Sequence, residues 1–153
     1  MREQGYGRIA NIGSVVGFLP APYRGIYSAS KHALEGYSES LDHEVRQFGI
    51  RVSVIEPGFT RTGTGQNAQQ AGQTLAAYAM ERALVIDAVR ESTANGKEPD
   101  KVASVVLHAL TSRSPRPRYL AGRQAKLISR LRKFPPEGLF DKGLRRRFGL
   151  VTA

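Results

Sequence analysis

Cysteine is absent from this 153-residue chain, and histidine occurs only three times. Without cysteine, neither a disulfide nor thiolate chemistry can contribute to structure or function. The histidines lack the spacing of metal ligands, so we expect packing or surface roles, and no bound metal, for His32, His43 and His108. No apolar run approaches the ~20 residues of a membrane span, and the first residues do not resemble a signal peptide. These absences predict a cytoplasmic protein.

Most of the chain also lacks a net charge. Residues 1–112 hold 11 basic and 11 acidic residues, whereas residues 113–153 hold 12 basic and 2 acidic residues. The whole net charge of +10 therefore belongs to the tail. A hydrophobic content of 41% predicts one globular domain with a core. No nucleic-acid motif accompanies the basic residues, so we predict no nucleic-acid partner.

A serine, a tyrosine and a lysine stand together in the stretch NIGSVVGFLPAPYRGIYSASK. Tyr27 follows Ser14 by thirteen positions, and Lys31 follows Tyr27 by four. At positions i and i+4 of a helix, Tyr27 and Lys31 project from one face. Ser14 comes just after Arg8–Ile12, an apolar run that predicts a buried strand. The three side chains can therefore converge at the C-terminal edge of a sheet, where open α/β sheets bind ligands.

The chemistry that these three side chains suit is proton transfer to or from an alcohol oxygen. An ammonium group on the next helical turn and the positive end of the helix both favour the phenolate form of a tyrosine. A serine hydroxyl could hold the substrate oxygen while Tyr27 exchanges its proton. Tyrosine and lysine also meet at this spacing by chance on surface helices, so a solvent-facing pair is the alternative interpretation.

Strand and helix patterns alternate along the chain. A helix is predicted from Tyr27 to about Phe48, between the strand Arg8–Ile12 and a second strand, Arg51–Glu56. Strand, helix and strand form a βαβ unit, so the two strands should be parallel. The apolar stripe of the helix consists of Leu34, Tyr37, Leu41, Val45 and Phe48. A second line of small residues, which would let a neighbouring helix approach closely, consists of Ala29, Ala33, Gly36 and Ser40.

The remaining patterns predict three further kinds of element. The polar segment Gly63–Thr74 should be mobile when no ligand is bound. Helices are predicted from Leu75 to about Ser92 and from Pro99 to about Ser112, and a third strand over Arg118–Ala121. Two short basic helices follow over 122–133 and 137–148, in which leucine and phenylalanine are interleaved with arginine and lysine.

As a set, these motifs resemble the short-chain dehydrogenase/reductase family. The resemblance rests on Ser14, the glycine-bearing turn around it, the YSASK segment and Val52–Thr62, and it extends from Gln4 to about Leu120. It implies an α/β fold with a Rossmann-type, doubly wound parallel sheet. It also implies an oxidoreductase that interconverts an alcohol and a ketone or aldehyde with NAD or NADP. In that family the serine, tyrosine and lysine are catalytic, which assigns Ser14, Tyr27 and Lys31.

The resemblance assigns cofactor binding to the loop after the second predicted strand. Pro57 and Gly58 would shape this loop against the nicotinamide, and Thr60 would offer backbone groups to its carboxamide. The hydroxyl of Thr62 would lie near the carboxamide or a phosphate. Tyr27 and Lys31 would contact the cofactor as well, Lys31 through the nicotinamide ribose. From the residues alone, the loop can also be interpreted as a tight turn with exposed threonines.

The family's glycine-rich turn, which presents backbone amides to the pyrophosphate, is missing upstream of Ser14. An asparagine that completes the family's proton relay is missing there too. We therefore expect a C-terminal part of a longer enzyme, with a truncated catalytic domain of about three strands over residues 1–121. Residues 122–153 would form a basic helical tail packed on or beside it. Alone, the chain should be inactive and should not bind NAD(P)H measurably at micromolar concentrations.

The expected partners follow from the same features. The substrate would be a small-molecule alcohol or carbonyl compound, with bulky apolar compounds of steroid or retinol type among the candidates. In the family the tyrosine-bearing helix commonly builds a subunit interface, which implies a homo-oligomer for the full-length enzyme. A basic amphipathic tail can bind anionic membranes, although packing over the substrate side is the favoured interpretation. A second hypothesis is a non-catalytic module that dimerises or binds a membrane surface.

Overall fold

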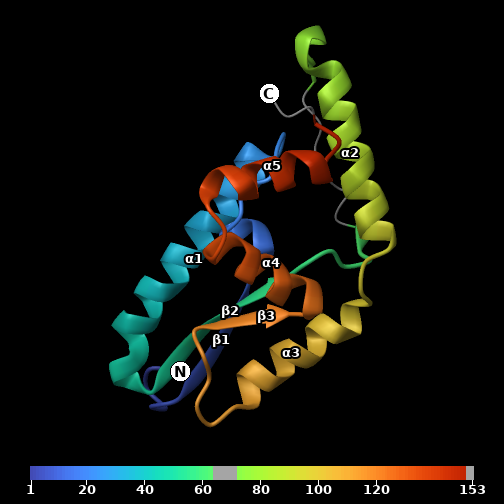
Figure 1. Cartoon of the computed structure of the whole chain (residues 1–153). Helices are drawn as coiled ribbons and strands as arrows, with labels where there is room; N and C mark the ends of the chain where they lie inside the picture. Colours follow the sequence, from blue (N-terminus) through green and yellow to red (C-terminus); the bar gives the residue numbers. More distant parts are fainter. Residues whose placement is uncertain (64–71, 151–153) are drawn as a thin grey trace.

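The fold is known from a computed structural model, which describes residues 1–63 and 72–150 (Figure 1). Strands β1 (Gly7–Ile12), β2 (Ile50–Pro57) and β3 (Arg118–Ala121) form one sheet in the order β1-β2-β3. Both strand pairs are parallel. This arrangement confirms the predicted α/β fold with a Rossmann-type parallel sheet of three strands.

The helices begin and end close to the predicted boundaries. The α-helices are α1 (Gly25–Val45), α2 (Ala79–Ala94), α3 (Pro99–Thr111), α4 (Arg123–Lys133) and α5 (Glu137–Arg147). Short 3-10 turns cover Val15–Gly17, Arg46–Phe48 and Ala76–Tyr78. Most of the predicted loop Gly63–Thr74 lies outside the described residues, so its expected mobility stays a prediction.

Helices α1 and α3 cover opposite faces of the sheet (Figure 1). Side chains of a strand alternate between the two faces. In β1, Ala10 packs with the core cluster beneath α3, whereas the next residue, Asn11, hydrogen-bonds to α1. The cluster beneath α3 is centred on Ile55, Ala109 and Tyr119. Strand β2 lies between β1 and β3, and all its residues from Val52 to Glu56 are buried.

The face that α1 turns toward the sheet is polar, and the apolar stripe predicted for it is not the buried face. Ser38 donates a hydrogen bond to the carbonyl of Leu34 at 2.6 Å and accepts one from Asn11 at 2.9 Å. Polar side chains can be buried here because they have partners. The buried residues of α1 are Ser28, Glu35, Ser38 and Asp42. The predicted stripe is half-buried at Leu34, Leu41 and Val45 and exposed at Tyr37 and Phe48.

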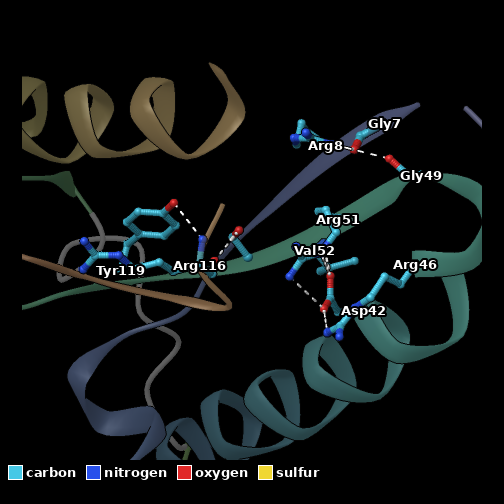
Figure 2. Close-up of polar contacts among 10 residues, drawn as sticks. Gly7, Arg8, Asp42, Arg46, Gly49, Arg51, Val52, Arg116 and Tyr119 are labelled. Atoms are coloured by element: carbon cyan, nitrogen blue, oxygen red, sulfur yellow. Dashed lines mark hydrogen bonds and ion pairs between the residues drawn. The ribbon is translucent and has the colours of Figure 1, made fainter. Parts of the chain in front are cut away.

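Asp42 fastens the last turn of α1 to β2 (Figure 2). One oxygen of its carboxylate accepts hydrogen bonds from the backbone N–H of Val52 at 2.8 Å and from Nε of Arg51 at 2.9 Å. The other oxygen contacts Arg46, and the side chain is only 3% exposed. Burial opposes ionisation of Asp42. The hydrogen bonds from Arg51, Val52 and Arg46 outweigh that effect and lower the pKa of Asp42 to about 2.

The residues just before β3 form hydrogen bonds that hold this strand where its pairing with β2 begins. The N–H of Arg116 donates to the hydroxyl oxygen of Tyr119 at 2.9 Å, and the hydroxyl of Ser53 donates to the carbonyl of Arg116 at 2.8 Å (Figure 2). The N–H of Val54 donates to the carbonyl of Pro117. At the opposite edge, β1 pairs with no strand other than β2 in the part of the chain that the structure describes.

We predict that Asp42→Asn lowers the free energy of unfolding by about 2 kcal/mol at neutral pH, because the folded state loses a carboxylate that it stabilises. The folded-state pKa lies below the usual value of 3.8. The contribution of Asp42 is therefore complete above pH 3.8 and is lost as the pH falls toward about 2. Urea unfolding at neutral pH and at about pH 2 measures the difference between Asp42→Asn and the unmodified protein. Glu44→Gln, on the exposed face of α1, is the control. If the loss in free energy of unfolding caused by Asp42→Asn were as large in acid as at neutral pH, the charge of Asp42 would not be its cause.

Candidate active site

A cavity of about 900 Å³ lies at the C-terminal ends of β1 and β2. Parallel strands bring their carboxyl ends to one edge of the sheet, and the loops that leave those ends surround a ligand site. The cavity is lined by every site residue that the sequence predicts: Ser14, Tyr27, Lys31, Pro57, Gly58, Thr60 and Thr62.

Ser14 stands in a tight turn that begins where β1 ends. The N–H of Gly13 donates to the carbonyl of Ile55 at 2.8 Å, which ties this turn to β2. The hydroxyl oxygen of Ser14 then accepts a hydrogen bond from the N–H of Val16 at 3.3 Å. The sequence forms this local structure because serine is a favourable residue at the start of a helical turn.

The turn depends on two glycines that pack directly on α1. A Cβ atom at Gly13 would lie 2.6 Å from Cγ1 of Val54 and 2.9 Å from Oε1 of Glu35. A Cβ atom at Gly17 would lie 3.0 Å from the same oxygen of Glu35. The two contacts at Gly13 would force neighbouring atoms to move, and the one at Gly17 would be tight, so glycine allows the Ser14 turn to approach the helix that carries Tyr27.

Tyr27 and Lys31 lie in the first two turns of α1 and are both half-buried. The ammonium group of Lys31 donates to the carbonyl of Ile12, the last residue of β1, at 2.8 Å. The same group lies 5.8 Å from the centre of the Tyr27 ring. Lys31 therefore contacts both the Tyr27 ring and the last residue of β1, the strand that precedes Ser14.

Arg24 is a residue of this site that sequence reasoning missed. Its guanidinium carbon lies 4.3 Å from the centre of the Tyr27 ring, in the range of a cation–π contact, and the residue lines the cavity. Two cations thus stand against the same ring. The signal in the sequence was the spacing of Arg24 and Tyr27, at i and i+3 where the helix begins.

The loop from Pro57 to Thr62 is held by the segment before α3. Thr60 pairs with Lys97 in an isolated parallel bridge, and the N–H of Lys97 donates to the carbonyl of Phe59 at 3.1 Å. A Cβ atom at Gly96 would lie 2.9 Å from the backbone of Phe59, so this approach also requires a glycine. The hydroxyl of Thr60 donates to the carbonyl of Gly58 within the loop. Backbone contacts with Lys97 therefore hold this loop in place where it lines the cavity.

A buried carboxylate lies beneath the Ser14 turn. One oxygen of Glu35 accepts a hydrogen bond from Arg118 of β3 at 3.1 Å. Its other oxygen is buried without a hydrogen-bond partner among the residues described. Burial raises the pKa of Glu35, and the hydrogen bond and charge of Arg118 offset part of that effect. The sequence did not single out Glu35, because its neighbours come from distant segments.

The outer walls of the cavity are apolar and come from the second half of the chain. Val102 and Val106 of α3 face it, as do Leu131 of α4 and Phe140 of α5. The end of α5 packs with α2 through Val85, Phe148 and Leu150, which are all buried. The arrangement combines polar groups at the sheet edge with apolar walls opposite them.

Residues 1–63 and 72–150 contain neither a candidate metal site nor a candidate membrane span. No group of three or more histidine and acidic side chains there could hold a metal ion. None of the helices in these ranges has the length and apolar character that crossing a membrane requires.

The fold and cavity define an α/β protein with a cavity at the carboxyl ends of a parallel sheet, and comparisons identify its relatives. The family profile described as short chain dehydrogenase matches residues 1–73. The chain is 33% identical over 156 residues to 3-ketodihydrosphingosine reductase of Bacteroides thetaiotaomicron, across 95% of this chain and 55% of that protein. It is 35% identical over 160 residues to retinol dehydrogenase 5 of Homo sapiens, across 91% of this chain and 48% of that protein.

A solved structure gives the same result. A short-chain dehydrogenase/reductase from Burkholderia phymatum in complex with NAD is similar with a TM-score of 0.68 and 26% identity, over 86% of this chain and 48% of that chain. The chain belongs to the short-chain dehydrogenase/reductase family, as its motifs predicted. It spans about half the length of the curated relatives it matches.

We predict that Gly13→Ala lowers the free energy of unfolding by about 1–3 kcal/mol, because its new methyl group overpacks the space between Val54 and Glu35. The matched control is Gly36→Ala, where a Cβ atom meets nothing within 4 Å. In mid-helix this control should raise stability by up to about 1 kcal/mol. Urea unfolding of the two variants compares these effects. Equal stability of the two variants would show that the Ser14 turn does not need its close approach.

Proposed function

We propose that the chain provides the catalytic centre of an oxidoreductase that interconverts an alcohol and a ketone or aldehyde with NAD or NADP. The observation that supports this most strongly is that Ser14, Tyr27 and Lys31 line one cavity together with the loop Pro57–Thr62. Serine and tyrosine hydroxyls beside a fixed cation suit proton exchange with an alcohol oxygen.

In this proposal Tyr27 gives a proton to the carbonyl oxygen, or takes one from the alcohol. The ammonium group of Lys31 is fixed by the carbonyl of Ile12 and lies 5.8 Å from the centre of the Tyr27 ring. The guanidinium carbon of Arg24 lies 4.3 Å from the same centre. Both cations therefore stand close enough to attract the negative charge that develops on the phenol oxygen while the proton moves.

Ser14 would orient the substrate oxygen. Its hydroxyl oxygen already accepts a hydrogen bond from the N–H of Val16. A serine hydroxyl has one hydrogen to donate as well as its acceptor positions. That hydrogen can be directed into the cavity, toward the same oxygen that exchanges a proton with Tyr27.

The residues present fit the nicotinamide end of the cofactor. Pro57, Gly58, Thr60 and Thr62 would hold it, together with Tyr27 and Lys31. The loop Pro57–Thr62 and Lys31 line the same cavity, and the ammonium group of Lys31 has three donors and uses one of them on Ile12. When bound, the cofactor supplies the two-electron redox chemistry. The chain's own residues position the substrate and move the proton.

The apolar walls support a bulky apolar substrate. Helices α3, α4 and α5 contribute aliphatic and aromatic side chains to the cavity that would hold both cofactor and substrate. Two relatives bear the names of a ketodihydrosphingosine reductase and a retinol dehydrogenase, which is consistent with substrates of this kind.

We also propose that the full-length enzyme is a homo-oligomer that uses α1. The line of small residues on this helix is exposed along its whole length, so the packing of the described chain does not use it. Small side chains let a second helix approach closely. The line consists of Ala29, Ala33, Gly36 and Ser40.

In a full-length enzyme that contains this chain, Tyr27→Phe should lower turnover at least ~100-fold and leave cofactor affinity nearly unchanged, because only the proton carrier is removed. Steady-state rates and cofactor titration measure the two effects. Tyr37→Phe, an exposed tyrosine of the same helix, is the control and should retain full activity. Retention of more than about a tenth of the wild-type rate in Tyr27→Phe would count against the assignment.

In the same enzyme, Lys31→Ala should lower both turnover and cofactor affinity, since the ammonium group serves the tyrosine and the ribose together. Lys101→Ala removes an exposed lysine of α3 and is the matched control. A variant in which turnover falls while cofactor affinity stays at the wild-type value would restrict Lys31 to the proton step.

A further inference from the structure

The outward face of α4 carries an apolar stripe that the rest of the described chain does not cover. Leu127, Leu131 and Phe134 are 56%, 47% and 81% exposed. Their spacings of four and three residues place them on one side of the helix. Ala125, which is 0% exposed, marks the side that packs on the domain. Leu139, near the start of α5, is 65% exposed. These four exposed side chains form what we call the α4–α5 patch.

Basic residues run beside the patch. Arg123, Lys126 and Arg130 are all exposed, and their spacings of three and four residues align them along α4 next to the apolar stripe. Residues 113–153 hold 12 basic and only 2 acidic residues, so the segment of the chain that carries the patch is strongly cationic.

The patch borders the cavity. Leu131 and Leu139 line the cavity and are also exposed, so they lie at its mouth. Leu127 and Phe134 are one helical turn from Leu131 on either side. An apolar surface therefore continues from the cavity wall to the outside of the molecule.

Lining the cavity does not bury these residues. Phe148 and Leu150 pack with Val85 and are buried, and Ile128 lines the cavity. The four residues of the patch instead remain exposed, and Phe134 is the most exposed of them. Exposed apolar patches of this kind mark sites of interaction with a protein or a membrane.

We propose that the α4–α5 patch docks on the surface of a lipid bilayer that contains anionic lipids. The apolar stripe enters the interfacial region while the neighbouring arginines and lysine contact the headgroups. The charge of the tail selects an anionic bilayer over a neutral one and over a second copy of the same cationic surface. If the proposed function holds, the cavity mouth then faces the lipid, and an apolar substrate can enter without crossing water.

Flotation of the 153-residue chain with lipid vesicles tests the proposal without cofactor or turnover. Vesicles of phosphatidylcholine alone are compared with vesicles that also contain phosphatidylserine, at ~0.01 M and ~0.15 M ionic strength. We expect the chain to float with the anionic vesicles, to float much less with neutral ones, and to bind less as salt rises. Aggregated protein sinks in this experiment and is not counted as bound.

Variants separate the apolar and the basic contributions. Phe134→Glu should abolish most flotation, and its matched control, Leu107→Glu on α3, replaces another apolar residue that is 63% exposed and should float normally. Arg123→Gln and Arg130→Gln should each weaken binding to anionic vesicles about fivefold, and Lys101→Gln should not. Circular dichroism of each variant verifies that these surface changes leave the fold intact.

Several outcomes would overturn the proposal. They are equal flotation with neutral and anionic vesicles, no flotation at low salt, and equal losses in Phe134→Glu and Leu107→Glu. Self-association that Phe134→Glu abolishes, without any flotation, would instead assign the patch to a second copy of the chain. Because none of these readouts involves the cofactor or Tyr27, failure of the docking proposal is distinguishable from failure of the proposed function.

Discussion

Helix α1 is fastened to the sheet at three points along its length by polar contacts, and the site depends on this attachment. Asp42 binds the backbone of β2 at the C-terminal end of the helix, Ser38 binds Asn11 in the middle, and Lys31 binds the carbonyl of Ile12 near its start. Each contact has a direction as well as a distance, unlike an apolar contact. The helix therefore has little freedom to slide or rotate, and Tyr27 is held over the carboxyl ends of the strands.

The two glycines of the Ser14 turn complete this attachment from the opposite side. They remove the side chains that would separate the turn from Glu35, so the serine and the tyrosine approach the cavity from adjacent elements. Glu35 is buried at a cost, since one of its oxygens lacks a hydrogen-bond partner within the described chain and burial raises its pKa. Arg118 compensates part of this cost and in doing so connects β3 to α1.

The cavity joins two halves of the chain that differ in chemistry. The first half contributes the polar edge, with hydroxyl and cationic groups in the turn after β1, on α1 and in the loop after β2. The second half contributes apolar walls and most of the positive charge, concentrated in α4 and α5. This division explains why the global charge says little about the first half of the chain. It also explains why the surface around the cavity mouth is both apolar and basic.

What the sequence determined was whatever depends on near neighbours in the chain. The parallel βαβ unit, Pro99 at the start of α3, the strand over Arg118–Ala121 and the i, i+4 spacing of Tyr27 and Lys31 are local patterns, and the structure contains all of them. Family membership was predictable for the same reason, because its motifs are short.

Tertiary packing alone decided the rest. The apolar stripe of α1 is not its most buried face, because hydrogen bonds from Asn11 and Val52, each at least ten residues away, satisfy the polar side. Arg24 over Tyr27, Glu35 against the Ser14 turn and Lys97 beneath the loop were likewise missed. A spacing rule shows which residues share a face of their own element. Which partner that face meets depends on contacts between segments far apart in the chain.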